Sequence, residues 1–195
     1  MASAFTPSER EHIITQLREA AWRHAGAEGM RKTSVDVLAT EAGISKGAFY
    51  HFYASKELLF LDMLEDWQKK AYAVAEQVMA ENASLPWQER ASLAFRATFR
   101  AILSRPIIKF LVDEAQVMLR RIPQDALEKH YHTQHEFIIG ILRHLNVVLT
   151  VPDDTAVAAI NILMLSLVHA ENIGPSYDQG IEALIDSACR QLIAG

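Results

Sequence analysis

Side chains suited to binding DNA gather in residues 39–56, which read ATEAGISKGAFYHFYASK. Within this stretch, four aromatic residues and a histidine occupy nine successive positions, 45–53. At helical spacing, Phe49 and either Phe52 or Tyr53 face inward, so the remaining polar groups face outward and can donate hydrogen bonds to phosphates or base edges. These outward residues are Lys46, Gly47, Tyr50 and His51. The same pattern also fits a small amphipathic helix with a solvated polar face.

The flanking residues predict a helix-turn-helix. One helical pattern ends at Ala42 and Gly43, where glycine tolerates a positive φ, and Ser45 can cap a second helix. In such a motif the amino-terminal end of the second helix reaches the DNA major groove, which adds Ser45 and Ala48 to the candidate contacts. Gly47 costs roughly 1 kcal/mol relative to alanine in a helix interior, so it indicates a close approach of DNA to the backbone.

Two further residues point to phosphate binding. Thr33, with Asp36 three positions later, is similar to a capping box that starts a helix, and its hydroxyl and the free helix amides could hold a phosphate. Lys56 follows the capping residue Ser55, in a first turn where the helix dipole favours an acidic group. A nearby phosphate would reverse that penalty.

Taken together, these residues resemble the DNA-binding domain of the TetR (tetracycline-repressor) family of bacterial transcription regulators. The resemblance runs from Ile13 to Leu59 and depends on the whole set at this spacing: Ile13-Ile14, Ala20-Ala21, Gly29-Met30, Thr33-Ser34-Val35, Leu38-Ala39, Ala42-Gly43-Ile44-Ser45-Lys46-Gly47, Tyr50-His51 and Ser55-Lys56-Glu57-Leu58-Leu59. The family usually has Tyr or His followed by Phe where this chain has Phe52 followed by Tyr53. A phosphate contact implied at Phe52 is therefore expected from the phenol of Tyr53.

Helical periodicity continues through the rest of the chain, without any β-hairpin signal. The sequence predicts an all-α fold of about nine helices, with one long helix running from Lys56 to about Ala83. The resemblance implies a helix-turn-helix DNA-binding domain of three helices at residues 1–54. It also implies a helical effector-binding and dimerisation domain at residues 55–195.

Composition limits the other possibilities. The single Cys189 excludes an intrachain disulfide, and the start of the chain lacks the apolar core of a signal peptide, so we expect a soluble cytoplasmic protein. The net charge of −5 divides into +1 for residues 1–56 (seven basic, six acidic) and −6 for the remainder (12 basic, 18 acidic). So small a positive charge predicts few phosphate contacts per subunit and a salt-dependent affinity that needs two subunits.

The last two expected helices, residues 153–172 and 177–193, predict a homodimer. The first is apolar nearly all round and must be covered on every side, while the second carries an apolar stripe. Packing against the same helices of a second subunit would cover both, and the resemblance implies this interface. The alternative is that the two helices pack wholly within one chain.

A small, mostly apolar effector is expected in the second domain. Glu114 and Gln134 are polar residues on otherwise apolar helix faces, and could orient a ligand in an apolar pocket or form hydrogen bonds within the core. The full candidate set is Trp67, Phe95, Phe99, Glu114, Met118, Gln134 and His169. The resemblance implies that the effector releases a repressor from a palindromic operator; a ligand-dependent activator is the alternative.

Catalytic and metal-binding functions are less well supported. His130, His132 and His135 lie close in sequence but lack a fourth ligand, so we expect solvated side chains; a metal-responsive regulator remains the alternative. The chain contains no glycine-rich phosphate loop, nucleophile elbow or His-Glu metal motif. We therefore expect neither an enzyme nor a bound cofactor.

Overall fold

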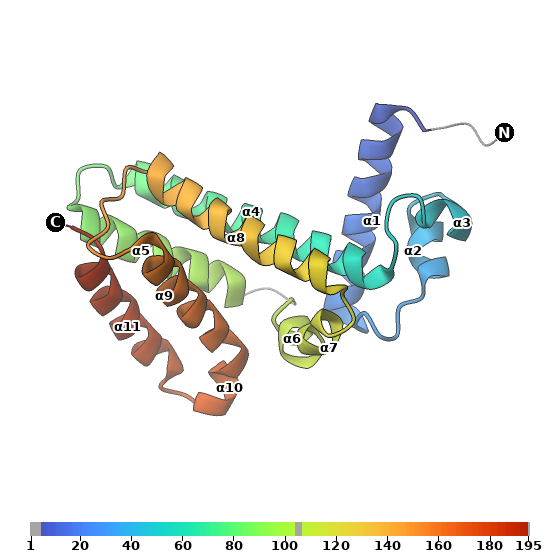
Figure 1. The fold of residues 1–195 in the computed structure, drawn as a ribbon. Helices are drawn as coiled ribbons and strands as arrows, with labels where there is room; N and C mark the ends of the chain where they lie inside the picture. The colour runs from blue at the N-terminus through green and yellow to red at the C-terminus, as the bar shows by residue number, and fades with distance from the viewer. Residues whose placement is uncertain (1–4, 104–106, 195) are drawn as a thin grey trace. The chain divides into compact units, whose positions relative to one another are not determined.

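Helices make up the fold of the residues that the structure, a computed structural model, describes, 5–103 and 107–194 (Figure 1). This confirms the expected all-α fold. The expected nine helical segments are all present in the described residues, and two of them are subdivided, as set out below. The elements in chain order are α1 (Pro7–Ala27), α2 (Val35–Glu41), α3 (Lys46–Phe49), α4 (Lys56–Glu81), α5 (Trp87–Leu103), α6 (Ile107–Asp113), α7 (Ala115–Leu119), α8 (Gln124–His144), α9 (Asp153–Ser166), the 3-10 helix η1 (Leu167–His169), α10 (Ala170–Ile173) and α11 (Tyr177–Leu192).

The helices form two compact units, and each unit combines two separate stretches of the chain. Unit 1 contains α1, α2, α3, the part of α4 up to Gln68, and the short helices α6 and α7. Unit 2 contains the rest of α4 together with α5, α8, α9, α10 and α11. The domain boundary predicted between residues 54 and 55 separates the expected DNA-binding domain from the expected effector-binding and dimerisation domain. It stays a prediction.

In unit 1, α1 is the central helix and packs on α2 and α6. Thr6 begins it with a capping box, because its hydroxyl accepts from Glu9 N and the Glu9 carboxylate accepts from Thr6 N. These bonds satisfy two groups that a helix end otherwise leaves unpaired. The inward stripe of α1 consists of Ile13, Leu17, Ala20, Ala21 and Ala25.

A polar clamp joins α1, α4 and the segment between α3 and α4. The Arg18 guanidinium donates to both carboxylate oxygens of Asp62, at 2.8 and 2.7 Å, and the Tyr53 hydroxyl donates to the same carboxylate. The hydrogen bond to Asp62 raises the pKa of Arg18, and burial raises the pKa of Tyr53. The two hydrogen bonds between Arg18 and Asp62 fix the direction of these two side chains and favour their charged forms.

In unit 2, Ile138 and Ile139 of α8 pack with Val157 of α9 in a buried apolar cluster. Helix α11 packs along α5, where Asp186 accepts a hydrogen bond from the buried Ser92 hydroxyl. The loop before α9 is joined to the end of α11, because Thr150 N donates to Leu192 O at 2.9 Å.

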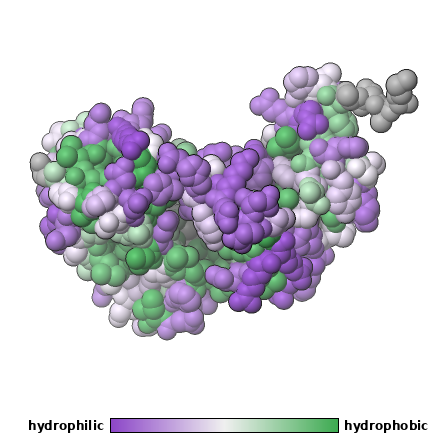
Figure 2. Space-filling view, viewed as in Figure 1, coloured by the Kyte–Doolittle hydropathy of each residue, from purple (hydrophilic) through white to green (hydrophobic). Residues whose placement is uncertain are grey.

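The apolar helix expected at residues 153–172 consists of α9, η1 and α10. By length and composition alone, Asp153–Ile173 is apolar enough to cross a membrane, with a mean hydropathy of 1.5. It is also exposed: Ile162 is 68% and Leu165 60% accessible. Figure 2 shows apolar side chains over the region of α9 and α11. An uncovered apolar face of this kind needs a partner surface, either protein or lipid.

The second subdivided segment is the pair α6 and α7, which meet at Glu114. Its φ of −131° departs from helical geometry, although Glu114 N still donates to Phe110 O and Glu114 O accepts from Met118 N. The break therefore changes the direction of one side chain while most of the helical hydrogen bonding is kept.

Candidate nucleic-acid interface

The helix-turn-helix forms as the sequence predicts. Gly43 adopts a φ of +70° in the turn between α2 and α3, a conformation in which glycine is favoured. Ser45 then caps α3, because its Oγ accepts from Ala48 N at 3.1 Å. With only four residues, α3 is positioned by its side chain Phe49, which is completely buried.

The face of α3 opposite Phe49 is open to solvent. Lys46, Gly47 and His51 are exposed, Tyr50 is 51% accessible, and Ala48 is half-buried. The Lys46 ammonium donates to Asp36 of α2 at 2.7 Å, and this hydrogen bond raises the pKa of the lysine. A phosphate would therefore compete with Asp36 for a lysine that is fully charged at neutral pH.

Gly47 is not closely packed against any of the residues that the structure describes. A Cβ added there would have Ser45 Oγ, 3.9 Å away, as its nearest described neighbour, which is an ordinary contact. An alanine would fit and would favour the helix. The surface over Gly47 is thus free for a close approach from outside.

The predicted capping box at Thr33 and Asp36 is wrong. Helix α2 starts one residue later than expected, so Ser34 is the capping residue and its Oγ accepts from Val37 N at 3.2 Å. Thr33 is only 1% accessible, and its hydroxyl donates to Gly29 O at 2.8 Å. The exposed hydroxyl at this end of α2 is therefore that of Ser34, and Thr33 is withdrawn from the candidate contacts.

Tyr53 is also withdrawn, because its hydroxyl donates to Asp62 in the clamp described above. Phe52 lies on another surface, where its ring contacts the Phe5 ring at 5.4 Å and lies under the Arg10 guanidinium at 4.9 Å. The exchange of aromatic types at positions 52 and 53 thus removes a phenol from the surface.

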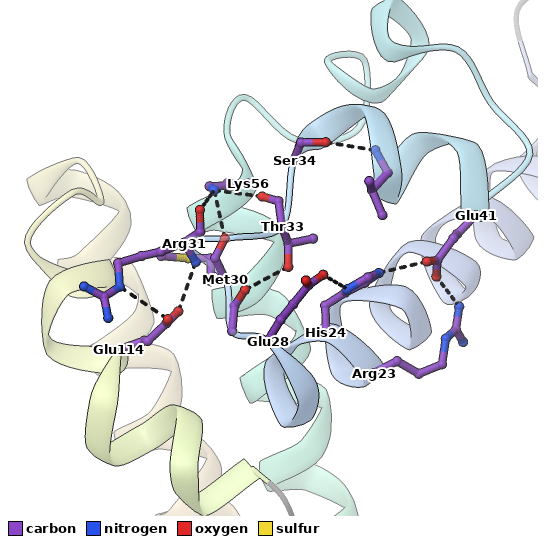
Figure 3. A network of polar contacts seen from close by, with 12 residues as sticks. Arg23, His24, Glu28, Met30, Arg31, Thr33, Ser34, Glu41, Lys56 and Glu114 are labelled. Atoms are coloured by element: carbon purple, nitrogen blue, oxygen red, sulfur yellow. Dashed lines mark hydrogen bonds and ion pairs between the residues drawn. The ribbon is translucent and has the colours of Figure 1, made fainter.

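Lys56 binds carbonyl groups of the protein's own backbone. Its ammonium donates to Met30 O and Thr33 O, each at 2.8 Å, and lies 3.4 Å from Arg31 O (Figure 3). These carbonyl groups offset the unfavourable position of a cation in the first turn of α4, so no phosphate is required there. Lys56 fixes the loop between α1 and α2 and positions the interface indirectly.

Sequence reasoning missed a brace between α1 and α2. The two ring nitrogens of His24 lie 2.8 Å from a carboxylate oxygen of Glu28 and 2.8 Å from one of Glu41, and Arg23 donates to Glu41 at 2.6 Å (Figure 3). Hydrogen bonds from Arg23 and His24 lower the pKa of Glu41. His24 and Glu41 are 17 positions apart, so no local spacing indicates their contact.

Exposed cations next to Ser34 were also missed. Arg31 and Lys32 precede the cap of α2, and both are exposed. Their position directly before a helix cap was a signal that could have been used. Together with the open face of α3 they give the described part of unit 1 several donors suited to phosphates.

The seven predicted effector residues are divided between the two units. Trp67, Glu114 and Met118 belong to unit 1, where Trp67 lies against Trp22 and Met118 is completely buried. The carboxylate of Glu114 accepts from Arg31 N, which supports the alternative of hydrogen bonding within the core. The other four belong to unit 2: Phe95 and Phe99 in α5, half-buried Gln134 in α8, and exposed His169 in η1.

A cavity of about 110 Å³ lies within unit 2, between α4, α5, α8, α9 and α11. Among the seven predicted residues, Phe95 is the one that contributes to its described lining. Leu142, Leu163 and Ile185 are representative of its other walls, and no charged side chain occurs among the described lining residues. The sequence could not indicate this cavity, because its walls are mainly ordinary aliphatic residues drawn from five helices.

Polar atoms at the cavity come from Tyr72, Thr98 and Cys189. Burial raises the pKa of Tyr72 to about 12 and that of Cys189 to about 11, so both are neutral near pH 7. The Thr98 hydroxyl already donates to Ala94 O at 2.9 Å. The cavity is therefore suited to a small uncharged molecule.

Of the three histidines considered as metal ligands, His135 contacts surface carboxylates. His135 Nε2 lies 2.8 Å from Asp154 Oδ1, while His132 is exposed. Among the residues that the structure describes, no group of three or more His, Cys, Asp or Glu is arranged to hold a metal ion.

Comparison with known proteins points to one family. Residues 17–63 match the model of bacterial regulatory proteins of the tetR family. The chain is also 27% identical, over 139 residues, to the HTH-type transcriptional repressor KstR2 of Mycolicibacterium smegmatis, an alignment that covers 71% of this chain and 67% of that protein.

Solved structures share the fold. A TetR transcriptional regulator from Rhodococcus sp. RHA1 superposes with a TM-score of 0.66 at 17% identity, covering 93% of this chain and 96% of that chain. RolR, solved in complex with the ligand resorcinol, superposes with a TM-score of 0.59 at 19% identity, covering 93% of this chain and 89% of that chain.

Replacing Gly47 by alanine separates stability from binding. We expect Gly47→Ala to leave the free energy of unfolding unchanged or to raise it by up to about 1 kcal/mol, because the added methyl group meets no clash and favours helix. Affinity for duplex DNA should fall by at least about fivefold, since overpacking costs roughly 1 kcal/mol or more. Urea denaturation and fluorescence anisotropy measure the two quantities.

The matched control is Gly43→Ala, in the turn. At a φ of +70° this change should lower stability by roughly 1 kcal/mol or more while leaving the affinity of the folded protein nearly unchanged. Undiminished DNA binding by Gly47→Ala would show that nothing approaches this glycine.

Proposed function

Because the chain belongs to the tetR family of bacterial regulatory proteins, we propose that it is a transcriptional repressor that binds a palindromic operator as a homodimer. The observation that carries the proposal is the solvent-exposed face of α3, with Lys46, Tyr50 and His51 at the surface over a buried Phe49. In a helix-turn-helix this face enters the major groove, where side chains read base edges. The protein acts in the cytoplasm, where bacterial DNA is found.

Within the proposed interface, the residues divide into two kinds of contact. Lys46, Ser34 and Lys32 donate to phosphates and set the position on the duplex, while Tyr50 and His51 reach base edges. Gly47 and Ala48 allow the backbone of α3 to approach closely. Residues 1–54 constitute the DNA-binding domain in this proposal, and residues 55–195 the effector and dimerisation domain.

The exposed apolar surface of α9 and α11 supports a homodimer. Leu184 of α11 is 59% accessible, and Ile162 and Leu165 of α9 are exposed to a similar degree. A second copy would remove these side chains from water, and two recognition helices about 34 Å apart would then match successive major grooves. The low positive charge of residues 1–56, +1 in total, makes a second subunit necessary for tight binding.

We further propose that the cavity in unit 2 holds the effector, a small uncharged molecule about the size of one six-membered ring. Its volume of about 110 Å³ is somewhat below the roughly 150 Å³ of an apolar cavity known to bind benzene. RolR binds resorcinol, a compound of this size, which makes such compounds reasonable first probes. Binding shifts α4 and lowers operator affinity 5- to 150-fold, the effect of a coupling of roughly 1–3 kcal/mol.

Activation is the alternative to repression. The relative KstR2 of Mycolicibacterium smegmatis is a repressor by name, which favours repression here. Expression of a reporter gene behind the selected operator, with and without the protein, distinguishes the two.

Alanine at Lys46 or Tyr50 should weaken operator binding. The duplex is obtained by selecting from a random-sequence pool with the wild-type protein, and affinities are measured at several salt concentrations. Lys46→Ala should reduce the slope of log K against log salt by about 0.9 for each phosphate that the lysine neutralises, whereas Tyr50→Ala should lower affinity with little change in slope. Lys129→Ala, an exposed lysine in α8, is the control. Full affinity in both α3 variants would refute this interface.

Leu184→Glu should convert the dimer into a monomer. A carboxylate in an apolar interface is costly to desolvate, yet at 59% accessibility the change leaves the folded chain intact. Sedimentation at micromolar concentration should give half the wild-type mass. The control is Tyr131→Glu, in α8 and 52% accessible, which should remain dimeric. A dimeric Leu184→Glu protein would place the interface elsewhere.

Neutral single-ring compounds should stabilise the protein. At 100 times its dissociation constant, a ligand adds about 2.7 kcal/mol to the free energy of unfolding, so phenol or resorcinol should raise the melting temperature. Benzoate, of similar size, should not, because the described cavity lining offers no cation. Ala159→Leu, which fills part of the cavity, should abolish the response. An equal shift with benzoate, or an undiminished response in the variant, would exclude this cavity.

A further inference from the structure

Glu114 is a nearly buried carboxylate whose partners lie in the DNA-binding half of unit 1. It is 6% accessible, and it accepts from Arg31 N at 3.1 Å and from Arg31 Nε at 3.3 Å (Figure 3). A carboxylate so far removed from water has to be compensated by donors. Both donors come from one residue of the loop between α1 and α2.

The loop backbone comes unusually close to this carboxylate. Gly29 has a φ of +85°, and a Cβ added there would overlap Glu114 Oε1. Only a glycine both adopts this backbone conformation readily and leaves room for the carboxylate in its present position. Glu114 therefore packs closely against the main chain of the loop and also binds the Arg31 side chain.

The same loop is held by Lys56, whose ammonium binds Met30 O and Thr33 O. Residues 29–33 are thus fixed by one cation from α4 and one anion from the junction of α6 and α7 (Figure 3). The loop leads directly into Ser34, the cap of α2. Its order therefore sets where α2 begins, and α2 is packed on α3.

We propose that Glu114 is a positioning residue through which α6 and α7 control the affinity for the operator. Its carboxylate holds residues 29–33 in the conformation that presents α2 and α3 to DNA, and a displacement of α6 and α7 that withdraws it loosens the loop. This inference rests on the proposed DNA-binding function. It assigns to that function a residue 83 positions from its partner in the chain.

The test compares three variants of the full-length protein. Glu114→Ala removes the acceptor, and Glu114→Gln keeps an oxygen for Arg31 N while removing the charge. Arg121→Ala is the matched control, because it removes another ion pair of the same segment, Arg121 Nη1 to Glu57 Oε1 at 3.5 Å, which does not involve the loop. The measurements are affinity for the selected duplex, amide hydrogen exchange of Arg31, and melting temperature.

Glu114→Ala should bind the duplex about 5- to 30-fold more weakly, within the usual range of couplings between sites, and should exchange the Arg31 amide hydrogen faster. Glu114→Gln should restore slow exchange and most of the affinity, and Arg121→Ala should match the wild type in both. Wild-type affinity in Glu114→Ala would overturn the inference. The inference would also be overturned if Arg121→Ala lost affinity too, and if the affinity loss of each variant simply followed the drop in its melting temperature. Failure of the wild-type protein to bind any duplex would refute the proposed function itself.

Discussion

Burial of the Phe49 side chain is the interaction on which the proposed function depends. A helix of four residues is far below the length at which a helix is stable alone in water, so α3 exists because this ring is completely enclosed. Its neighbours Tyr50 and Tyr53 contact the ring at centroid distances of 5.5 and 6.0 Å. Because the buried Phe49 side chain holds α3 in place, it also sets the direction of the outward-facing side chains of this helix.

Three charged groups in unit 1 support this surface from within. Lys56 binds backbone carbonyls, Arg18 is held by Asp62, and Glu114 is buried against Arg31. The cations Lys56 and Arg18 are therefore occupied within the protein. The proposed DNA-binding surface thus has few cations of its own, which is why the proposed mechanism uses a second subunit.

The helices themselves could be predicted from sequence, because helical periodicity and caps are local. Gly43 and Ser45 determined the turn and the start of α3 within a few residues, and the structure agrees with both. Thr33 shows the limit of that local reasoning. Either Thr33 or Ser34 can cap a helix, and only the burial of the Thr33 hydroxyl against Gly29 O decides between them.

Long-range contacts explain the remaining errors. Tyr53 and Lys56 were assigned to phosphates because their partners, Asp62 and the loop carbonyls, were not recognisable from spacing. For Glu114 the sequence left both a ligand pocket and a core hydrogen bond open, because the partner that decides between them lies 83 positions away. The described cavity is lined mainly by aliphatic residues, and nothing in their sequence pattern distinguishes a cavity wall from a filled core.

In the proposed mechanism, the exposed end of α3 is the surface that meets DNA. Hydrogen–deuterium exchange of the whole chain, measured with and without a tightly bound duplex, locates that surface without any substitution. We expect new protection of backbone amides in residues 45–51 and in the residues around Ser34, with none on the described surface of α8. Protection that falls on α8 or elsewhere, and leaves α3 unchanged, would be incompatible with this mechanism.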